Sequence, residues 1–400
     1  MKQCPVAKKC GGCQLQNLSY DAQLSLKQSK IIRMVGKYCH VDEIIGMEDP
    51  YRYRNKATHI FGFKSGKIVS GIYQSSARRI IPVDDCFLED EYSNKIVQTV
   101  KKLCVSFKLK AYDLNTKRGF VRHVLVRRGS NNGEIMAVIV TAKGDFPKKR
   151  DFVSALIEKH PDITTVVWNI NPTDTPIFLG QKSEVLYGSG YITDTLCDLK
   201  FRISPNSFYQ VNPIQTEILY NKAKEFASLT GKERVIDAYC GTGTIGLTMA
   251  KNAKEVIGVE VNANAVNDAR FNAEMNGIKN AKYICADAGE FMLEYAQKGE
   301  KIDVLITDPP RSGCSKKFLD SLLTLNPERI VYVSCNPETL SRDLFVLRKG
   351  GYRVNKIQPV DMFPHTEHVE TVVLLSRKDI YERIKFDVNV EELNRITQSK

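Results

Sequence analysis

Residues 234–246, Arg-Val-Ile-Asp-Ala-Tyr-Cys-Gly-Thr-Gly-Thr-Ile-Gly, decide the fold of this chain. An apolar segment over 234–238 runs into three glycines with the spacing Gly241-x-Gly243-x-x-Gly246. This pattern predicts a short strand, a tight turn and a helix, because glycine permits the backbone angles that such a turn requires. A glycine turn at the end of a parallel strand is typical of sites that bind an adenosine-containing ligand.

Short apolar segments alternate with helical stretches downstream of this turn. The segments are residues 256–261, 282–286, 303–307, 329–334 and 371–375. Alternation of this kind is typical of a parallel α/β sheet. We therefore expect a Rossmann-like domain over residues 206–400, whose last part, 378–400, is a charged tail.

The first half of the chain has a different pattern. Residues 51–81 predict a meander of short strands, and residues 120–128 and 134–141 flank a turn rich in Gly and Asn, which predicts a hairpin. We expect a β-rich domain over residues 1–205. Residues of about 14–47, which include a helical pattern, could pack on the second domain despite their position in the sequence.

Charge is concentrated in the first half. The 400 residues carry a net charge of +12, and residues 51–150 hold 21 basic and 8 acidic side chains, or +13. A surplus this localised favours a surface that contacts nucleic-acid phosphates over a basic face that only contacts solvent. Within it, the strand at 120–128 bears Arg122, His123, Arg127 and Arg128, which we expect to grip phosphates. No apolar run approaches the ~18 residues of a membrane span, and no secretory signal is visible, so we expect a cytoplasmic protein.

Carboxylates at the ends of the predicted strands indicate which ligand the glycine turn binds. Glu260 lies 19 residues beyond Gly241, where it could bond ribose hydroxyls of a dinucleotide or of S-adenosylmethionine. Three features favour S-adenosylmethionine: Asp237 precedes the turn, Asp287 follows the third strand, and Asp308-Pro309-Pro310 follows the fourth. A flavin- or nicotinamide-dependent oxidoreductase remains the rival enzyme class, and an RNA-binding protein without activity is a third possibility.

A thiol and a carboxylate follow the next strands. The segment Val331-Tyr332-Val333-Ser334-Cys335 runs a buried strand into a cysteine, and Glu370 leads into the last strand. C5 of uracil becomes nucleophilic only after a thiolate adds to C6, and a base must later remove the C5 proton. Cys335 and Glu370 supply these two roles, and Asp308 could hold the uracil or the cofactor. Taken singly, Cys335 could be only a buried cysteine of a strand, and Glu370 could be only a surface glutamate.

Cysteines cluster at the start of the chain. Cys4, Cys10 and Cys13 have the spacing C-x5-C-x2-C, whereas the other eight cysteines are scattered. Three clustered thiols in a chain without an export signal suggest a metal or an iron–sulfur centre whose fourth ligand lies elsewhere. A structural zinc is the competing interpretation.

Together these motifs resemble the RNA uracil-C5 methyltransferase family, most closely its iron–sulfur-containing 23S rRNA (uracil-5-)-methyltransferase branch. The resemblance extends to about residue 377 and includes Ser207-Phe208-Tyr209-Gln210-Val211-Asn212-Pro213, Ser334-Cys335-Asn336-Pro337 and His368-Val369-Glu370. It implies that Cys335 is the nucleophile and Glu370 the proton-abstracting base. The cofactor positions that it implies are Gln210, Tyr239, Thr244, Glu260, Asp287 and Asp308. The iron–sulfur ligands that it implies are Cys4, Cys10, Cys13 and Cys86.

The resemblance also implies the activity. We expect an α/β protein with a Rossmann-like S-adenosylmethionine-dependent methyltransferase domain, preceded by a β-rich iron–sulfur and RNA-binding domain that holds a [4Fe–4S] cluster. The expected reaction is methylation of C5 of a flipped-out uridine in 23S rRNA by a monomeric enzyme. A tRNA target is the alternative. Many relatives carry an N-terminal TRAM domain before the cysteine cluster, and we expect this chain to lack it because the cluster begins at Cys4.

Overall fold

The fold is that of a computed structural model, in which residues 4–74, 79–173 and 177–378 are described. These residues form two compact units, each built from several stretches of the chain. The first unit comprises Met1–Gln23, Met47–Thr216 and Phe363–Glu367, and the second comprises Leu24–Gly46, Glu217–Met362 and His368–Lys400. The predicted tail at 378–400 lies outside the described residues except for Lys378.

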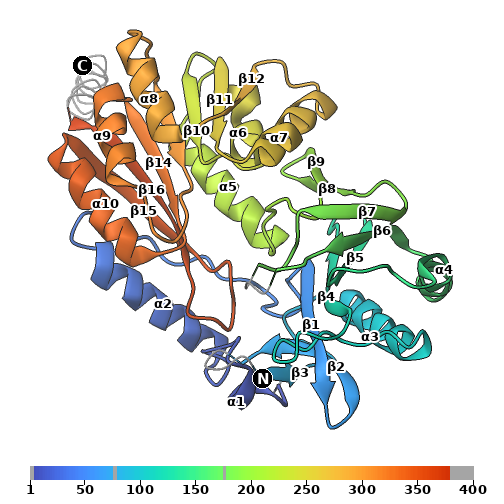
Figure 1. The fold of residues 1–400 in the computed structure, drawn as a ribbon. Coiled ribbons are helices and arrows are strands. Elements are labelled where there is room, and N and C mark those ends of the chain that lie inside the picture. The colour runs from blue at the N-terminus through green and yellow to red at the C-terminus, as the bar shows by residue number, and fades with distance from the viewer. Residues whose placement is uncertain (1–3, 75–78, 174–176, 379–400) are drawn as a thin grey trace, which may run out of the picture. The chain divides into compact units, whose positions relative to one another are not determined.

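The second unit contains the sheet that the sequence predicts, but the sheet is mixed rather than parallel: the strand over Glu370–Arg377 is antiparallel, and a strand over Tyr352–Val360 was not predicted (Figure 1). Its strand order is β12-β11-β10-β13-β14-β16-β15. The bounds are β10 (Arg234–Ala238), β11 (Glu255–Glu260), β12 (Ala281–Cys285), β13 (Val304–Thr307), β14 (Arg329–Ser334), β15 (Tyr352–Val360) and β16 (Glu370–Arg377). Strands β10 to β14 are parallel, whereas β16 is antiparallel to both β14 and β15. The sheet order reverses between β10 and β13, and open α/β sheets bind ligands at the carboxyl edge near such a switch.

Helices connect the strands of this sheet. They are α6 (Thr244–Met249) with the 3₁₀ turn η1 (Ala250–Asn252), α7 (Ala263–Met275), α8 (Ala288–Gln297), α9 (Lys316–Leu325) and α10 (Pro337–Lys349). One core cluster combines Phe318 of α9 and Leu340 of α10 with strand residues such as Ile236 and Ile330. The same cluster includes Ile31 of α2 (Tyr20–Val35), a helix that begins in the first unit and continues in the second. Helix α5 (Pro213–Ala227) also passes from the first unit to the second.

The part of α2 in the second unit is held by polar contacts as well as apolar ones. Lys27 Nζ lies 2.6 Å from Asp361 Oδ1, and neither side chain is exposed. After the helix, the backbone N–H of Asp42 donates to the carbonyl of Ile357 over 2.9 Å. Residues Leu24–Gly46 therefore complete the second unit beside β15, although they are distant from it in sequence.

The first unit is built on a second seven-stranded sheet, with the order β3-β2-β1-β4-β5-β6-β7. The bounds are β1 (Lys56–Lys64), β2 (Lys67–Tyr73), β3 (Ile80–Pro82), β4 (Val121–Arg128), β5 (Ile135–Thr141), β6 (Ile163–Ile170) and β7 (Lys182–Tyr187), with α1 (Ala7–Cys10), α3 (Glu91–Ser106), α4 (Lys149–Lys159) and the separate hairpin β8 (Ile192–Leu196) and β9 (Leu199–Ile203). The meander β1–β3 and the hairpin β4–β5 match the sequence predictions. Buried residues of α3 and α4 pack on the sheet, as Val100 and Phe152 do.

Candidate active site

The glycine turn after β10 is shaped by residues with left-handed backbone angles. Tyr239, Gly241 and Gly243 have φ angles of 61°, 54° and 79°. A Cβ at Gly243 would lie 2.6 Å from the hydroxyl of Tyr283, so a side chain does not fit there. Asp237 holds the far end of the turn, because its Oδ2 accepts the N–H of Gly246 over 2.8 Å. A Cβ at Gly241, in contrast, would meet no atom within 4 Å, so the turn leaves its backbone open to a ligand at that residue.

Glu260 stands next to this turn at the end of β11. Its Oε2 accepts the N–H of Gly241 over 3.2 Å, and its Oε1 accepts the N–H of Asn262 over 2.8 Å. These bonds hold the carboxylate in place beside the turn, where it can accept hydroxyl donors. Asp287 is exposed after β12, and its Oδ1 caps α8 by accepting the N–H of Glu290 over 3.0 Å.

A ring contact and a hydrogen bond between hydroxyls place two further predicted cofactor residues of the second unit, Tyr239 and Thr244. The ring of Tyr239 lies 5.0 Å from that of Phe318, and the hydroxyls of Thr244 and Tyr220 are 3.0 Å apart. Among the described residues, Asp237 Oδ1 and the Tyr283 hydroxyl are buried without a hydrogen-bond partner. Burial, together with the nearby charges of Asp308 and Glu260, raises the pKa of Asp237 to about 7. Unpaired buried polar atoms at a glycine turn fit a site that is completed by a polar ligand.

Cys335 and Glu370 are brought together by the register of two neighbouring strands. Ser334, the last residue of β14, pairs with Thr371 of the antiparallel β16. Cys335 follows Ser334 and Glu370 precedes Thr371, so the thiol and the carboxyl stand at the same edge of the sheet. Cys335 is half-buried, whereas Glu370 is only 5% exposed. The alternative interpretation of Glu370 as a surface glutamate is therefore wrong.

Asp308 joins this pair from β13, whose residue Thr307 is aligned with Tyr332 of β14. Burial raises the pKa of both Asp308 and Glu370, and the charge of Asp308 raises that of Glu370 further. Burial raises the pKa of Cys335 to about 11, with contributions from Glu370 and Asp308. The positive charge of Arg311 acts in the opposite direction and lowers the pKa of both Cys335 and Glu370. The site thus combines a thiol, carboxyl groups that bind protons near neutral pH, and one cation.

The sequence did not predict a place for Arg311 in this site. Its carbonyl accepts the side-chain amide of Asn336 over 3.0 Å, which ties the loop after Asp308 to the residue that follows Cys335. Asp343 Oδ2 holds the same loop by accepting the N–H of Cys314 over 2.8 Å and the hydroxyl of Tyr332 over 2.7 Å. Only spatial proximity reveals these contacts, because Asp343 lies 29 residues beyond Cys314.

Gln210 belongs to the first unit, in the loop that follows β9. Asn55 anchors this loop, because its side-chain amide donates to the carbonyl of Gln210 over 3.1 Å and its N–H to that of Val211 over 2.9 Å. Arg127 Nη2 donates to the carbonyl of Ser207 over 2.7 Å. The predicted cofactor signature is therefore held by β4 and by the residue that precedes β1.

The expectation that the basic side chains of β4 grip phosphates is wrong for most of them. Arg122, His123 and Arg127 are 3%, 8% and 6% exposed. Arg127 lies under the loop that contains Ser207, and burial lowers its pKa to about 10. Arg128 is 41% exposed but forms an ion pair with Asp90, with a distance of 2.9 Å.

The four predicted cluster cysteines all lie in the first unit. Cys4, Cys10, Cys13 and Cys86 are half-buried free thiols, and Cys13 and Cys86 contact the same small apolar cluster, which contains Met47, Tyr53 and Leu88. Burial, together with the neighbouring Cys10 and Cys4, raises the pKa of Cys13 to about 12, and Cys13 in turn contributes to the raised pKa of Cys86. Cys13 is therefore within electrostatic range of the other three thiols. Within the part of the chain that the structure describes, no three His, Cys, Asp or Glu side chains form a group spaced to hold a metal ion.

Comparison with known proteins identifies the family. A sequence model described as tRNA (Uracil-5-)-methyltransferase matches residues 177–378, half of the chain. The chain belongs to the tRNA (uracil-5-)-methyltransferase family. Its uncharacterized RNA methyltransferase relatives include one from Caldanaerobacter subterraneus subsp. tengcongensis, 47% identical over 94% of this chain and 84% of the relative, and one from Halalkalibacterium halodurans, 46% identical over 94% and 83%.

A solved structure supports the same assignment within this family. The crystal structure of Pyrococcus abyssi tRNA (uracil-54, C5)-methyltransferase in complex with S-adenosyl-L-homocysteine has a TM-score of 0.78 and 29% sequence identity, covering 94% of this chain and 87% of the other. The prediction of an enzyme of the RNA methyltransferase class, with an α/β methyltransferase fold, is confirmed. Among the described helices, none is both long and apolar enough to cross a membrane.

Proposed function

We propose that this family member methylates C5 of a uridine in 23S rRNA, with S-adenosylmethionine as the methyl donor. The observation that carries the proposal is the convergence of Cys335, Glu370 and Asp308 at one edge of the second sheet. A thiol, a buried carboxyl with a raised pKa and a cofactor turn suit uracil-C5 methylation, because this reaction needs a nucleophile and a base at the same carbon–carbon bond.

The donor would be held by the glycine turn and the residues around it. Glu260 would accept the ribose hydroxyls, Asp287 would lie at the adenine, and Tyr239, Thr244 and Asp308 would complete this part of the site. The resemblance also implies Gln210, a residue of the first unit, as a cofactor residue. The unpaired Oδ1 of Asp237 and the open turn at Gly241 fit such a ligand. When bound, S-adenosylmethionine supplies an electrophilic methyl group on its sulfonium.

Cys335 would begin the reaction as a thiolate. Its proton must leave first, and the carboxylate of Asp308 can accept it, because burial gives Asp308 a raised pKa and its charge acts on Cys335. Glu370 then stays ionised for the later step. The thiolate forms a bond to C6, and the electron pair of the C5–C6 double bond moves toward O4 as an enolate. Arg311 favours the negatively charged thiolate, since its charge lowers the pKa of Cys335.

Glu370 would end the reaction. After C5 has taken the methyl group, C5 carries both that methyl and its original proton, and Glu370 in its ionised form removes the proton. The electron pair of the C5–H bond reforms the C5–C6 double bond, and the Cys335 thiolate leaves C6. A carboxylate whose pKa lies closer to neutrality than usual is a stronger base for this step.

We further propose that the first unit binds RNA and holds a [4Fe–4S] cluster on Cys4, Cys10, Cys13 and Cys86. The charge interactions of Cys13 with Cys4, Cys10 and Cys86 support this proposal, since buried thiolates that repel one another need a cation to remain ionised. The spacing of these thiols in the described residues does not itself form a metal site, so the cluster would have to draw them together. The similarity to the iron–sulfur branch favours iron over zinc. We expect the enzyme to act as a monomer in the cytoplasm, on a uridine flipped out of its RNA stack.

A tRNA substrate is the second candidate, and the similarity to the Pyrococcus abyssi enzyme favours it. Mapping of 5-methyluridine in rRNA and tRNA from cells with and without the gene separates the two. Loss of one or more 23S rRNA sites, with tRNA unchanged, is the expected result. Loss confined to tRNA would replace the rRNA proposal, and no loss in either RNA would contradict the proposed function.

A further inference from the structure

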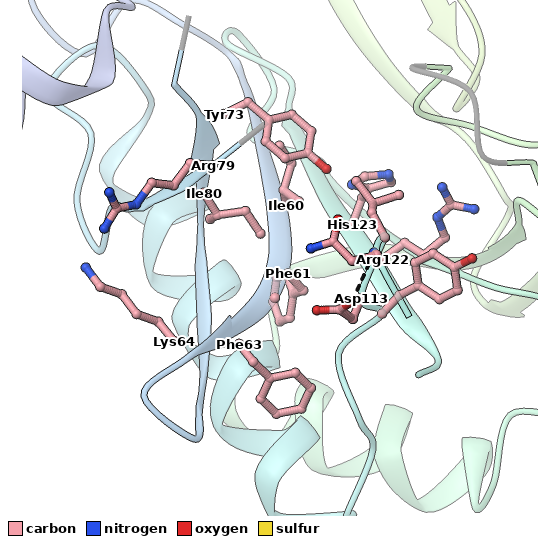
Figure 2. A pocket seen from close by; sticks show the side chains of 14 residues that line it. Ile60, Phe61, Phe63, Lys64, Tyr73, Arg79, Ile80, Asp113, Arg122 and His123 are labelled. Atoms are coloured by element: carbon pink, nitrogen blue, oxygen red, sulfur yellow. Dashed lines mark hydrogen bonds between the residues drawn. The ribbon is translucent and has the colours of Figure 1, made fainter. Parts of the chain in front are cut away.

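The first unit contains a pocket of about 290 Å³ that involves none of the predicted catalytic, cofactor or cluster residues. Figure 2 shows side chains from β1, from the ends of β2 and β3 and from β4 around it, together with a loop at residues 112–115. Its volume lies at the lower end of the roughly 300–1,000 Å³ that small-molecule sites occupy. It is therefore large enough for one planar ring system and small for a dinucleotide.

Aromatic side chains supply several parts of the pocket lining. Phe61 is buried, whereas Phe63 is 46% exposed. Tyr73 and Tyr112 are half-buried, and the guanidinium of Arg122 lies 4.6 Å from the centre of the Tyr112 ring. Exposed aromatic rings beside cationic side chains are the usual surface on which unstacked nucleobases pack.

The charged groups of the lining favour an anion. Lys64, Arg79 and Arg122 are cationic, and Asp113 is the one carboxylate among the lining residues. Asp113 is already used by its own turn, because its Oδ1 accepts the N–H groups of Asn115 and Thr116 over 3.0 and 2.8 Å. Lys64 and Arg79 are exposed, and no ion pair with an acidic side chain is found for either among the described residues.

Two buried polar atoms in the lining residues have no partner. His123 is 8% exposed and its ring is stacked 4.1 Å from that of Phe178, yet its Nδ1 makes no hydrogen bond to any described residue. The same holds for Arg122 Nε. Burial and the charge of Arg122 lower the pKa of His123 to about 3, so the ring is neutral and can either donate to or accept from a polar base edge.

We propose that this pocket binds one unstacked nucleobase of the substrate RNA, at a nucleotide other than the target uridine, with Arg79 and Lys64 on the adjoining phosphates. The proposal rests on the proposed function, since it assumes an RNA substrate. The buried basic side chains of β4 do not explain how the first unit contacts RNA, because they cannot reach phosphates. The pocket offers a different contact, with a base. Binding there holds a second point of the RNA and so fixes how the substrate lies on this unit.

The test uses the full-length protein and a fluorescently labelled fragment of 23S rRNA. Phe63→Ala removes an exposed ring, and Arg79→Ala removes an exposed charge. Phe345→Ala and Arg150→Ala are the matched controls, because both residues are exposed and neither lines the pocket. Binding is measured by fluorescence anisotropy over a salt series, methylation by steady-state kinetics, and folding by thermal melting.

Each pocket variant should weaken RNA binding by roughly tenfold, which is the size of one lost base stack or phosphate contact. Arg79→Ala should also reduce the slope of log K against log salt by about 0.7–0.9, whereas Phe63→Ala should leave it unchanged. The KM for RNA should rise with kcat at saturating RNA unchanged, and melting temperatures should match those of the controls.

Binding by both pocket variants that equals binding by the controls would overturn the proposal, and so would a fall in kcat without a change in KM. Weaker RNA binding by the pocket variants supports it even if the unmodified enzyme makes no 5-methyluridine in the RNA, a result that would contradict only the proposed function. Failure of the unmodified protein to bind RNA at all would overturn both.

Discussion

Cys335 and Glu370 stand beside each other at the ends of two antiparallel strands, because Ser334 of β14 pairs with Thr371 of β16. The two residues are far apart in sequence and close only through this register. A shift of β16 by one residue would turn the Glu370 side chain to the other face of the sheet. The register therefore decides whether Cys335 and Glu370, the proposed nucleophile and base, can act on the same uracil ring.

Replacement of Cys335 by alanine should abolish methylation, because no other group then adds to C6. We expect a fall of at least about 10³-fold in kcat, measured by transfer of labelled methyl groups to RNA. Binding of S-adenosylmethionine, followed by calorimetry, should be retained. Cys39→Ala is the matched control, since Cys39 is also half-buried in the second unit. Near-normal methylation by Cys335→Ala would exclude covalent catalysis by this thiol.

Replacement of Glu370 by glutamine should stop the reaction later. Thiolate addition and methyl transfer remain possible, but removal of the C5 proton slows by about 10²–10⁴-fold. The enzyme should then accumulate as a covalent complex with methylated RNA, visible as a slow band on a denaturing gel. A substrate with 5-fluorouridine should trap the unmodified enzyme in the same way, since fluorine cannot leave as a proton. Absence of adduct in both experiments would contradict the assigned roles.

The pH dependence of stability should reveal the buried carboxyl of Glu370. Its pKa in the folded protein is raised by burial and by Asp308, so folding favours its protonated form. The stability that this form contributes is complete below the unfolded pKa and is lost as the pH rises through the folded pKa. Glu370→Gln, which cannot ionise, should therefore melt at a higher temperature than the unmodified protein at pH 8–9, and the difference should shrink toward pH 5. A difference that is constant with pH would show that Glu370 is not protonated preferentially on folding.

Arg127 should stabilise the folded protein rather than bind an RNA phosphate. Arg127→Ala removes the hydrogen bond to the Ser207 carbonyl and should lower the free energy of unfolding by about 1.5–3 kcal/mol, measured by denaturant titration. The salt slope of RNA binding should not change. Arg128→Ala, which breaks a partly exposed pair with Asp90, should cost about 0–1 kcal/mol. If folded Arg127→Ala showed a smaller slope of log K against log salt for RNA binding, Arg127 would contact a phosphate despite its burial.

The proposed cluster is tested by metal analysis. Protein purified without oxygen should be brown and contain about four iron and four sulfide per chain, as a [4Fe–4S] centre requires. Cys86→Ser should lose iron, whereas Cys104→Ser should keep it, because Cys104 is buried in the apolar core of the first unit. One zinc per chain without iron or sulfide would assign the four thiols to a structural zinc instead.

Local sequence patterns were sufficient for the parts of the molecule that short-range chemistry determines. The strand, glycine turn and helix at 234–246 follow from apolar residues and glycines within a few positions of each other, and the hairpin β4–β5 follows from its Gly- and Asn-rich turn. The thiol at the end of β14 was visible for the same reason, since a buried strand runs directly into Cys335. In each case the residues that define the feature are neighbours in the chain.

Only the tertiary structure decided which of these features meet and which side chains are covered. A period of two residues shows that a strand has two faces, but it does not show which strand lies beside it or what packs on each face. Thus β16 inserts between β14 and β15 and carries Glu370 to Cys335, and the loop at Ser207 buries Arg127, which the sequence alone presented as a phosphate ligand. The pocket beside His123 is likewise formed by strands and a loop that come together only on folding. The reason is physical: burial and sheet order depend on long-range packing, which no single segment of the sequence contains.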